Sequence, residues 1–511
     1  MRGEPLLLCI TISQNMELLQ GFLSTTFECQ LSFLVTVFVT LGAFYCGYVK
    51  FKTASLQGRN LPPGSLGFPV IGESIGFLSA MKKNNRREWV ESRIKKYGPV
   101  FKTSLMGSHV VILTGQAGNK LIFSANDAIT GNQTMSTAAI FGKHSIFELE
   151  GSRHKLLRSV MMNYLKPDNL QKYVVQMDSI VKQRMLQELQ GKDSVQFAPL
   201  IKKVTFDISC SILFGLPEGM EKDVLFHDSD IAITGSWALP LDIPGTPFRK
   251  ARKARARICE VLSNLIKRRM IELEDGNVGS QEDVITSFLN LRDEEGKSLL
   301  EEEIIDNLLT LIFGHRTTAI LLYLFLRYVG KDSHVYNKVL EEQKEVVKAK
   351  AGSDGKLEWS EMQSMKYTWR VAQELMRLNP PVFGNFRYTI KDLSFDGFDI
   401  PKGWRMYWVS CATHMDEKIF QAPETFDPSR FESPSKSIPP YTYIPFGAGS
   451  RICPGSDFAR FEMLMIVHHL MMNYKWTTMI PDEPMVSNPT PYPAMGFPVK
   501  LHPMKEREDN A

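Results

Sequence analysis

A cysteine near the C-terminus lies in a glycine-rich loop, and this loop restricts the chain more than any other feature. Residues 446–455 read Phe-Gly-Ala-Gly-Ser-Arg-Ile-Cys-Pro-Gly, and a helix-like run from Phe458 to Met472 follows. Glycines let the backbone turn sharply and pass close to another group. Backbone N–H groups in such a loop can point at the sulfur of Cys453 and tune its charge. The pattern favours a metal-binding thiolate over an ordinary buried cysteine.

The loop resembles the haem-ligand signature of the cytochromes P450, which is Phe, two residues, Gly, any residue, Arg, any residue, Cys, any residue and Gly. Every defining position is filled, by Phe446, Gly449, Arg451, Cys453 and Gly455. The resemblance implies that Cys453 is the axial thiolate of haem b, that Phe446 packs against the ring and that Arg451 pairs with a propionate. Thiolate ligation pushes electron density toward iron and favours O–O cleavage.

A second motif lies upstream, where Glu374 and Arg377 are three residues apart on a helical pattern that ends at Pro380-Pro381. Such residues face each other on a helix, although most pairs of this kind are solvated salt bridges worth little. P450s carry a Glu-x-x-Arg pair at this place, completed by the arginine of a Pro-x-Arg-Phe segment, here Arg430. The resemblance implies a structural triad that locks the loops behind the haem.

Two further segments match the propionate side of the family. Arg387 begins a strand-like stretch where the family often places a propionate contact, and His154 and Arg158 are four residues apart on a helical pattern. Many P450s have a Trp-x-x-x-Arg pair there. An imidazole N–H can donate to a propionate as an indole does. A solvated helix face is the alternative for His154 and Arg158.

The segment that resembles the oxygen-binding helix of the family departs from its pattern. Residues 303–328 are helix-like and contain Phe313, Gly314, Arg316 and Thr317. The family pattern is a small residue, Gly, any residue, an acid and then Thr. Gly314 would let the helix open opposite the haem, and Thr317 matches the threonine that hydrogen-bonds oxygen. Phe313 replaces the small residue, and Arg316 replaces the acid.

Arginine stays protonated in proteins and cannot shuttle a proton at neutral pH. Three accounts of Arg316 therefore remain open. Water and Thr317 carry the proton relay alone, or Arg316 pairs with a substrate carboxylate or an internal acid, or proton delivery is impaired.

Length and composition indicate one large catalytic domain. The chain has 511 residues, of which 43% are hydrophobic, and its net charge of +4 implies no nucleic-acid partner. Seven scattered cysteines without a Cys-x-x-Cys pair argue against a disulfide framework or a zinc site and fit a reducing compartment. The expected fold is mainly α with small β-sheets (α+β), as the P450 resemblance implies. Strand-like segments lie at 100–103, 110–113, 386–390, 393–395 and 406–409.

The N-terminal region predicts a membrane anchor. Residues 29–49 contain no charged side chain, and about 20 apolar residues cross a hydrocarbon core. Lys50 and Lys52 follow, so the positive-inside rule places the C-terminal bulk in the cytosol. A cleaved signal peptide would have a leading basic end and a shorter core. We expect a single-pass endoplasmic-reticulum protein with a lumenal N-terminus (1–28), a transmembrane helix (29–49), a basic, proline-rich hinge (50–64), a catalytic domain (65–504) and a polar tail (505–511).

A basic stretch at 249–257 follows an apolar, proline-containing loop at 239–248. This combination suits an anionic membrane surface. A solvated helix face is the alternative.

Several long segments resemble one plant clan of P450s, which includes brassinosteroid oxidases, pentacyclic-triterpenoid oxidases and taxane hydroxylases. These segments are 61–73, 244–248, 366–369 and 381–387. The resemblance implies a bulky, lipophilic terpenoid substrate, O2 as oxidant and electrons from a membrane-bound NADPH–P450 reductase. Candidate pocket residues are Phe313, Val382, Phe383 and Met495.

The resulting prediction is a haem-thiolate monooxygenase that hydroxylates or further oxidises a C–H bond of a triterpenoid or diterpenoid. The alternatives are a brassinosteroid or sterol oxidase, a reductase-independent P450 that rearranges a peroxide, and a haem-binding paralogue without turnover.

Overall fold

The computed structural model describes residues 58–68, 71–131, 133–276, 283–349, 356–432, 438–487 and 490–504, with isolated positions between 32 and 56. The chain forms two compact units, residues 1–61 and 62–511, and every element below belongs to the second. The expected anchor at 29–49 (apart from isolated positions) and the tail at 505–511 lie outside the described residues. Among the described residues, one helix is long and apolar enough to cross a bilayer, Glu301–Val329, and most of it is buried in the protein.

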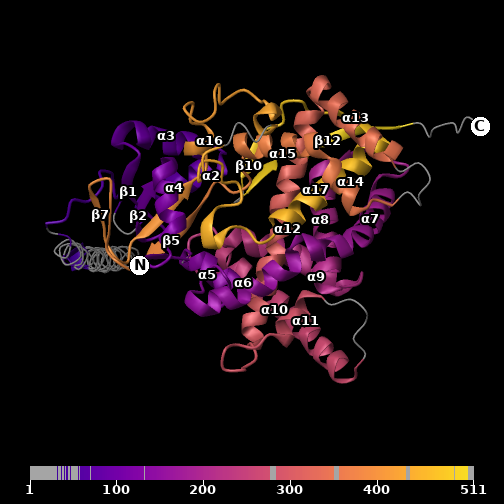
Figure 1. The fold of residues 1–511 in the computed structure, drawn as a ribbon. Helices are drawn as coiled ribbons and strands as arrows, with labels where there is room; N and C mark the ends of the chain where they lie inside the picture. The colour runs from indigo at the N-terminus through magenta and orange to yellow at the C-terminus, as the bar shows by residue number, and fades with distance from the viewer. Residues whose placement is uncertain are drawn as a thin grey trace, which may run out of the picture. The chain divides into compact units, whose positions relative to one another are not determined.

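The second unit is mainly helical (Figure 1). Its α-helices are α2 (Ser74–Lys82), α3 (Arg86–Tyr97), α4 (Gly115–Ser124), α5 (Met135–Phe141), α6 (Gly151–Leu165), α7 (Pro167–Leu189), α8 (Phe197–Phe214), α9 (Met220–Gly235), α10 (Pro247–Glu274), α11 (Val284–Asn290), α12 (Glu301–Val329), α13 (Ser333–Ala349), α14 (Trp359–Ser364), α15 (Lys366–Leu378), α16 (Cys411–His414) and α17 (Ser456–Asn473). Two short 3₁₀ helices are η1 (Pro428–Phe431) and η2 (Gly449–Arg451).

The strands form small sheets. The largest has the order β1-β2-β8-β5-β3, in which β2 and β8 are parallel and the other pairs are antiparallel. A three-stranded sheet has the order β4-β12-β9, and β6-β7 and β10-β11 form two-stranded sheets. The strands are β1 (Val100–Leu105), β2 (Ser108–Leu113), β3 (Ile129–Thr130), β4 (Ser194–Gln196), β5 (Gly384–Thr389), β6 (Leu393–Phe395), β7 (Phe398–Ile400), β8 (Arg405–Val409), β9 (Tyr474–Thr478), β10 (Met485–Ser487), β11 (Pro491–Pro493) and β12 (Pro498–Pro503).

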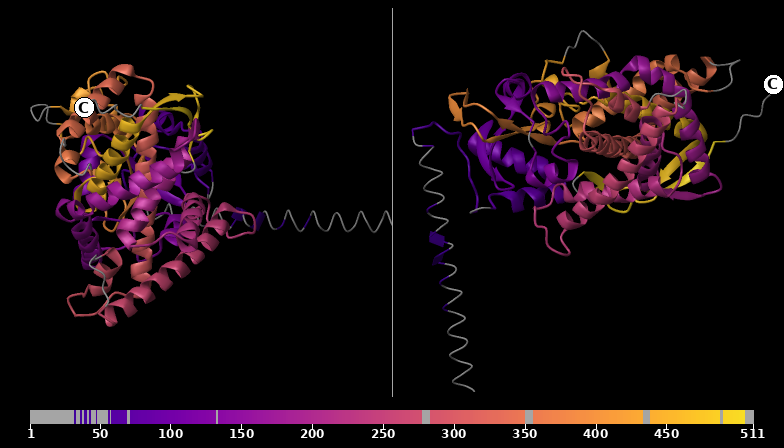
Figure 2. Two further views of the ribbon diagram at one scale, coloured as in Figure 1. Left: turned by 90° about the vertical axis from the view of Figure 1, so that its right-hand side faces the viewer. Right: turned by 90° about the horizontal axis from the view of Figure 1, so that it is seen from below.

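The five-stranded sheet gathers with α2, α3 and α4 on one side of this unit, and α7, α8, α12 and α17 gather on the other (Figures 1 and 2). Each side has its own hydrophobic core. The larger core surrounds α12 and α17, and α12 is apolar on most of its faces because other helices enclose it. The smaller core joins α2 and α3 to the sheet and includes Phe77, Trp89, Phe383 and Tyr407.

Candidate active site

Cys453 lies between η2 and α17, in a loop whose shape depends on glycine. Its backbone N–H donates to the carbonyl oxygen of Phe446 at 2.9 Å. Gly449 has φ +67°, and a Cβ at this position would lie 2.0 Å from the carbonyl oxygen of Phe123. A side chain at Gly449 is therefore excluded both by conformation and by space.

The thiol of Cys453 lies in surroundings that suit metal ligation. Burial raises the pKa of Cys453, while the backbone N–H of Gly455 and the Arg158 guanidinium oppose this shift. A buried thiol of this kind becomes a thiolate when a cation compensates it. The N–H of Gly455 is directed at the sulfur, as expected for a group that tunes a thiolate ligand.

Three arginines and one histidine gather beside this loop. Arg451 donates to the carbonyl oxygens of Ile146 at 2.9 Å and Leu149 at 2.6 Å. Arg158, on α6, donates to the carbonyl oxygen of Ile452 at 2.5 Å. Arg387, on β5, donates to the carbonyl oxygen of its neighbour Phe386 at 2.8 Å. His154 is buried on α6, one turn before Arg158.

These four side chains form a positive cluster. Burial, with a contribution from Arg451, lowers the pKa of Arg387 to about 9. Burial lowers the pKa of Arg451 to about 10, and burial followed by the three arginines lowers the pKa of His154 to about 4. No carboxylate in the described part of the chain forms an ion pair with Arg158, Arg387 or Arg451. Glu148 and Glu150 act electrostatically on Arg451 without forming an ion pair with it. Among the described residues, Arg158 and Arg387 have no carboxylate partner, and the positive charges of the cluster oppose one another.

An iron porphyrin fits these residues. Cys453 would supply a sulfur for iron, and the two porphyrin propionates would supply negative charge to the arginines. Phe446 packs at the edge of the larger hydrophobic core and provides an apolar neighbour for a flat ring. The structure thus brings together all the residues that the sequence assigned to the ligand loop and the propionate side.

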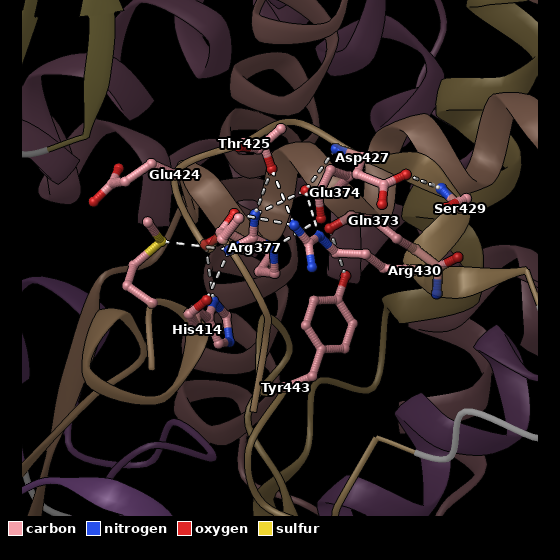
Figure 3. A network of polar contacts seen from close by, with 12 residues as sticks. Gln373, Glu374, Arg377, His414, Glu424, Thr425, Asp427, Ser429, Arg430 and Tyr443 are labelled. Carbon is pink, nitrogen blue, oxygen red and sulfur yellow. Dashed lines mark hydrogen bonds and ion pairs between the residues drawn. The ribbon is translucent and has the colours of Figure 1, made fainter. Parts of the chain in front are cut away.

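Glu374 and Arg377 form a fully buried pair on α15 (Figure 3). Arg377 Nε and Nη2 donate to the two carboxylate oxygens of Glu374 at 2.8 and 2.7 Å. Arg430 Nε, on η1, lies 3.4 Å from Glu374 Oε1. The backbone N–H of Asp427 donates to Glu374 at 2.9 Å, and Arg377 donates to the carbonyl oxygen of His414 at 2.8 Å. The triad ties the segment between α16 and η1 to α15.

The residues that the sequence assigns to the oxygen side lie in the middle of α12. Gly314 is exposed, and a Cβ on it would meet no atom within 4 Å. The Thr317 hydroxyl donates to the carbonyl oxygen of Gly314 at 2.9 Å. The helix surface is thus open beside a polar hydroxyl. Phe313 points elsewhere and packs edge-on against Phe141, with ring centroids 4.8 Å apart.

Arg316 contacts an internal acid. Its Nη1 donates to Asp230 Oδ1, on α9, at 2.6 Å, and Lys202 of α8 pairs with the other oxygen of Asp230. Burial lowers the pKa of Arg316 to about 10. Of the three accounts left open by the sequence, pairing with an internal acid is the one this contact supports. Sequence reasoning missed Asp230 and Lys202, because neither belongs to a motif.

The other candidate residues are dispersed. Phe383 is buried in the smaller core, whereas Met495 is 58% exposed. Leu239, Leu241 and Ile243, in the loop before α10, are exposed apolar residues. The basic stretch forms the start of α10, where Arg249 and Arg252 both pair with Asp242.

Comparisons with known proteins agree with this geometry. The family model of the cytochromes P450 matches residues 62–502. The chain is 38% identical to a taxane 10-beta-hydroxylase of Taxus cuspidata, with 87% of this chain and 90% of that protein covered. It is 37% identical to a beta-amyrin 28-monooxygenase of Medicago truncatula, with 94% and 99% covered. It is also similar to the solved structure of retinoic acid bound cyanobacterial CYP120A1, with TM-score 0.79, 30% identity and coverage of 88% and 100%.

Proposed function

The chain belongs to the cytochrome P450 family, and we propose that it oxidises a C–H bond of a plant triterpenoid or diterpenoid. The observation that carries this proposal is the position of the Cys453 loop beside a cluster of three arginines, none of which forms an ion pair with a carboxylate of the described residues. The similar taxane hydroxylase and beta-amyrin monooxygenase support a terpenoid substrate. The similar structure with retinoic acid bound supports an isoprenoid ligand. A sterol is the alternative substrate.

The bound haem, with its iron held by Cys453, supplies the activation of dioxygen for C–H oxidation. Arg158, Arg387 and Arg451 hold the propionates by charge-assisted hydrogen bonds. His154 donates from a ring N–H in the same place. Burial keeps the imidazole neutral at neutral pH, since the pKa of His154 is lowered to about 4.

Thr317 and Asp230 provide the polar groups on the side of the site opposite Cys453. The Thr317 hydroxyl accepts or donates a hydrogen bond toward the oxygen site beside Gly314. Arg316 cannot release its proton and instead positions Asp230, whose side chain is 35% exposed and therefore reaches water. Asp230 and water thereby take the place of the acid that this family usually carries on the helix.

The protein acts with NADPH–P450 reductase at the endoplasmic-reticulum membrane in this proposal. The charge-free run at 29–49 followed by lysines supports a single-pass anchor with a cytosolic catalytic domain. The exposed Leu239, Leu241 and Ile243, followed by the basic start of α10, support contact with the membrane surface.

The test is product analysis with the full chain and a plant reductase in microsomes. Beta-amyrin, a taxane and a plant sterol are supplied with NADPH, and products are identified by mass spectrometry. We expect NADPH-dependent oxygenated products from the triterpenoid or the taxane, and none from Cys453→Ser. If only the sterol is oxidised, the substrate class is the sterols and not the triterpenoids or diterpenoids. Conversion of an added hydroperoxide without NADPH would contradict the proposed reaction.

A further inference from the structure

Arg86 is a buried arginine outside the haem-binding residues. It is the first residue of α3, and its side chain lies in the smaller core with 8% of its surface exposed. Its Nη2 lies 3.4 Å from the carbonyl oxygen of Pro380, and its guanidinium carbon lies 5.3 Å from the centroid of the Phe383 ring. Both partners belong to the segment that connects α15 to β5. These contacts orient the guanidinium but leave its charge uncompensated.

The groups that face Arg86 are neutral. They are the hydroxyls of Tyr407 on β8 and Tyr323 on α12 and the thiol of Cys411. Burial raises the pKa of each of these three groups. No carboxylate of the described segments forms an ion pair with Arg86, and burial lowers the pKa of the guanidinium.

The neighbouring Arg87, unlike Arg86, has carboxylate partners. It is more exposed and pairs with both Glu91 at 2.6 Å and Glu424 at 2.5 Å. Two adjacent arginines at the start of α3 therefore have opposite surroundings, one with two carboxylates and one with none.

The Tyr407 hydroxyl beside Arg86 has no partner either. Tyr407 is fully buried, and its hydroxyl oxygen forms no hydrogen bond within the described residues. The indole N–H of Trp89, one turn after Arg86 on α3, is also buried without a partner. Unmatched buried donors and unpaired buried charges are costly. The Arg86 guanidinium and the Tyr407 hydroxyl, which interact electrostatically, together indicate a site for a ligand that brings a negative charge and hydrogen-bond acceptors.

This site is connected to the oxygen side through α12. Tyr323, which faces Arg86, also interacts electrostatically with Arg316. The two residues are seven positions apart, which is two turns or about 10 Å along one helix face. The Tyr323 hydroxyl donates to the carbonyl oxygen of Pro491, and Arg316 Nη2 lies 3.5 Å from the Thr490 hydroxyl. Thr490 and Pro491, at the start of β11, thus lie against this face of α12.

We propose that Arg86 and Tyr407 bind the carboxylate of a terpenoid acid. This proposal rests on the terpenoid oxidation proposed above and narrows its substrate class. The guanidinium supplies the charge, and the two side chains donate to the carboxylate oxygens. A polycyclic skeleton held there extends along α12 toward Gly314, so the C–H bond that is oxidised lies at the end remote from the carboxylate.

Binding spectra of the haem-loaded full chain test this site. Oleanolic acid and abietic acid are titrated beside their methyl esters, and the change in haem absorption gives each Kd. We expect Arg86→Met to weaken binding of the acids by about 10- to 100-fold and to change the Kd of the esters by less than about 2-fold. Tyr407→Phe weakens acid binding by a smaller factor, and Arg87→Met, the matched surface control, leaves all four values unchanged.

Thermal unfolding of the ligand-free protein separates ligand binding from a structural role. Removing an uncompensated buried charge leaves Tm unchanged or raises it, so Arg86→Met does not lower Tm. Tyr407→Phe does not lower it either, because the hydroxyl that it removes has no hydrogen-bond partner among the described residues. A lower Tm with unchanged acid binding would overturn the inference in favour of a structural arginine. Wild type that binds esters as tightly as acids would overturn the subsite while leaving the terpenoid proposal intact. A failure of all four ligands to bind would overturn the subsite, and the product analysis with beta-amyrin and a taxane would then decide separately on the terpenoid proposal.

Discussion

Arg316 on α12 and Asp230 on α9 form an ion pair of 2.6 Å that joins two helices on the oxygen side of the site. The P450 family usually carries an acid at the position of Arg316. In this protein the positive charge lies on α12 and the acid lies on the facing helix, with Lys202 as a second partner. A carboxylate is therefore still present on this side of the site, but it lies on α9 and not on α12.

Removing the acid, and then exchanging the two charges, tests whether Asp230 takes part in proton delivery. Asp230→Asn removes the acid, and we expect the peroxide released per NADPH to rise by about 10-fold or more, since a positioned acid or base contributes at least that much. The triple variant Arg316→Asp/Asp230→Arg/Lys202→Met restores both the ion pair and an acid without repulsion from Lys202, so its coupling matches wild type. Glu221→Gln, which breaks the exposed pair with Arg268, serves as the control. Unchanged coupling in Asp230→Asn would exclude Asp230 from proton delivery.

Glu374→Gln leaves the Arg377 charge buried without its carboxylate. Breaking such a pair costs about 3–5 kcal/mol of the free energy of unfolding. Asp482→Asn, which breaks the exposed pair with Lys331, costs less than about 1 kcal/mol. Denaturant unfolding of the haem-loaded protein gives both values. Equal effects of the two substitutions would show that the triad does not hold the loops behind the haem.

We expect alanine substitutions at Gly447 and Gly449, the two glycines before Arg451, to lower the free energy of unfolding by different amounts. Gly447 has φ +75°, and the nearest atom to an added Cβ is 3.9 Å away, so Gly447→Ala costs about 1–2 kcal/mol from conformation alone. Gly449→Ala adds a collision with the carbonyl oxygen of Phe123 and costs at least about 3 kcal/mol. Haem content and Tm of the purified variants measure the difference. If Gly449→Ala is tolerated as well as Gly447→Ala, the loop is not packed as described.

Because of Glu462 on α17, we expect the free energy of unfolding to depend on pH. Glu462 is fully buried, and neither carboxylate oxygen has a hydrogen-bond partner among the described residues. Burial raises the pKa of Glu462 well above its ordinary value of 4.5, with the nearby Thr318 side chain opposing the shift. The folded state thus keeps a proton that the unfolded state releases as the pH rises above 4.5, and this residue makes stability fall as the pH rises.

Glu462→Gln removes that dependence. We expect the variant to be more stable than wild type from about pH 5 upward. The difference in the free energy of unfolding grows by at most about 1.4 kcal/mol per pH unit. Denaturant unfolding at several pH values measures the difference between the two proteins. A difference that stays constant with pH, or shrinks as the pH rises, would show that Glu462 is ionised in the folded protein.

The residues of short motifs were predictable from the sequence, because local spacing determines their geometry. Cys453 and its glycines lie within ten residues, and Glu374 and Arg377 lie one helical turn apart. The strands expected in the five-stranded sheet overlap β1, β2, β5 and β8 because apolar runs indicate them. Strand β12 was not expected, since it depends on pairing with the distant β9 and β4.

Contacts between residues far apart in the sequence were not predictable. Asp230 and Arg316 are separated by 86 residues, and no spacing relates them. Arg86 stands in a polar run of the sequence, where its neighbour Arg87 is indeed exposed and paired. The sequence alone cannot show which of the two enters the core, because that depends on how α3 packs against the segment after α15.

The most direct test of the whole account is the origin of the oxygen atom in the product. The full chain is incubated with reductase, NADPH, a triterpenoid or taxane substrate and isotopically labelled dioxygen, and the hydroxylated product is analysed by mass spectrometry. We predict one labelled oxygen atom in each hydroxyl group formed, and no product from Cys453→Ser. Oxygen that comes from water or from an added hydroperoxide, or product that forms without NADPH, would contradict the assignment as a terpenoid monooxygenase.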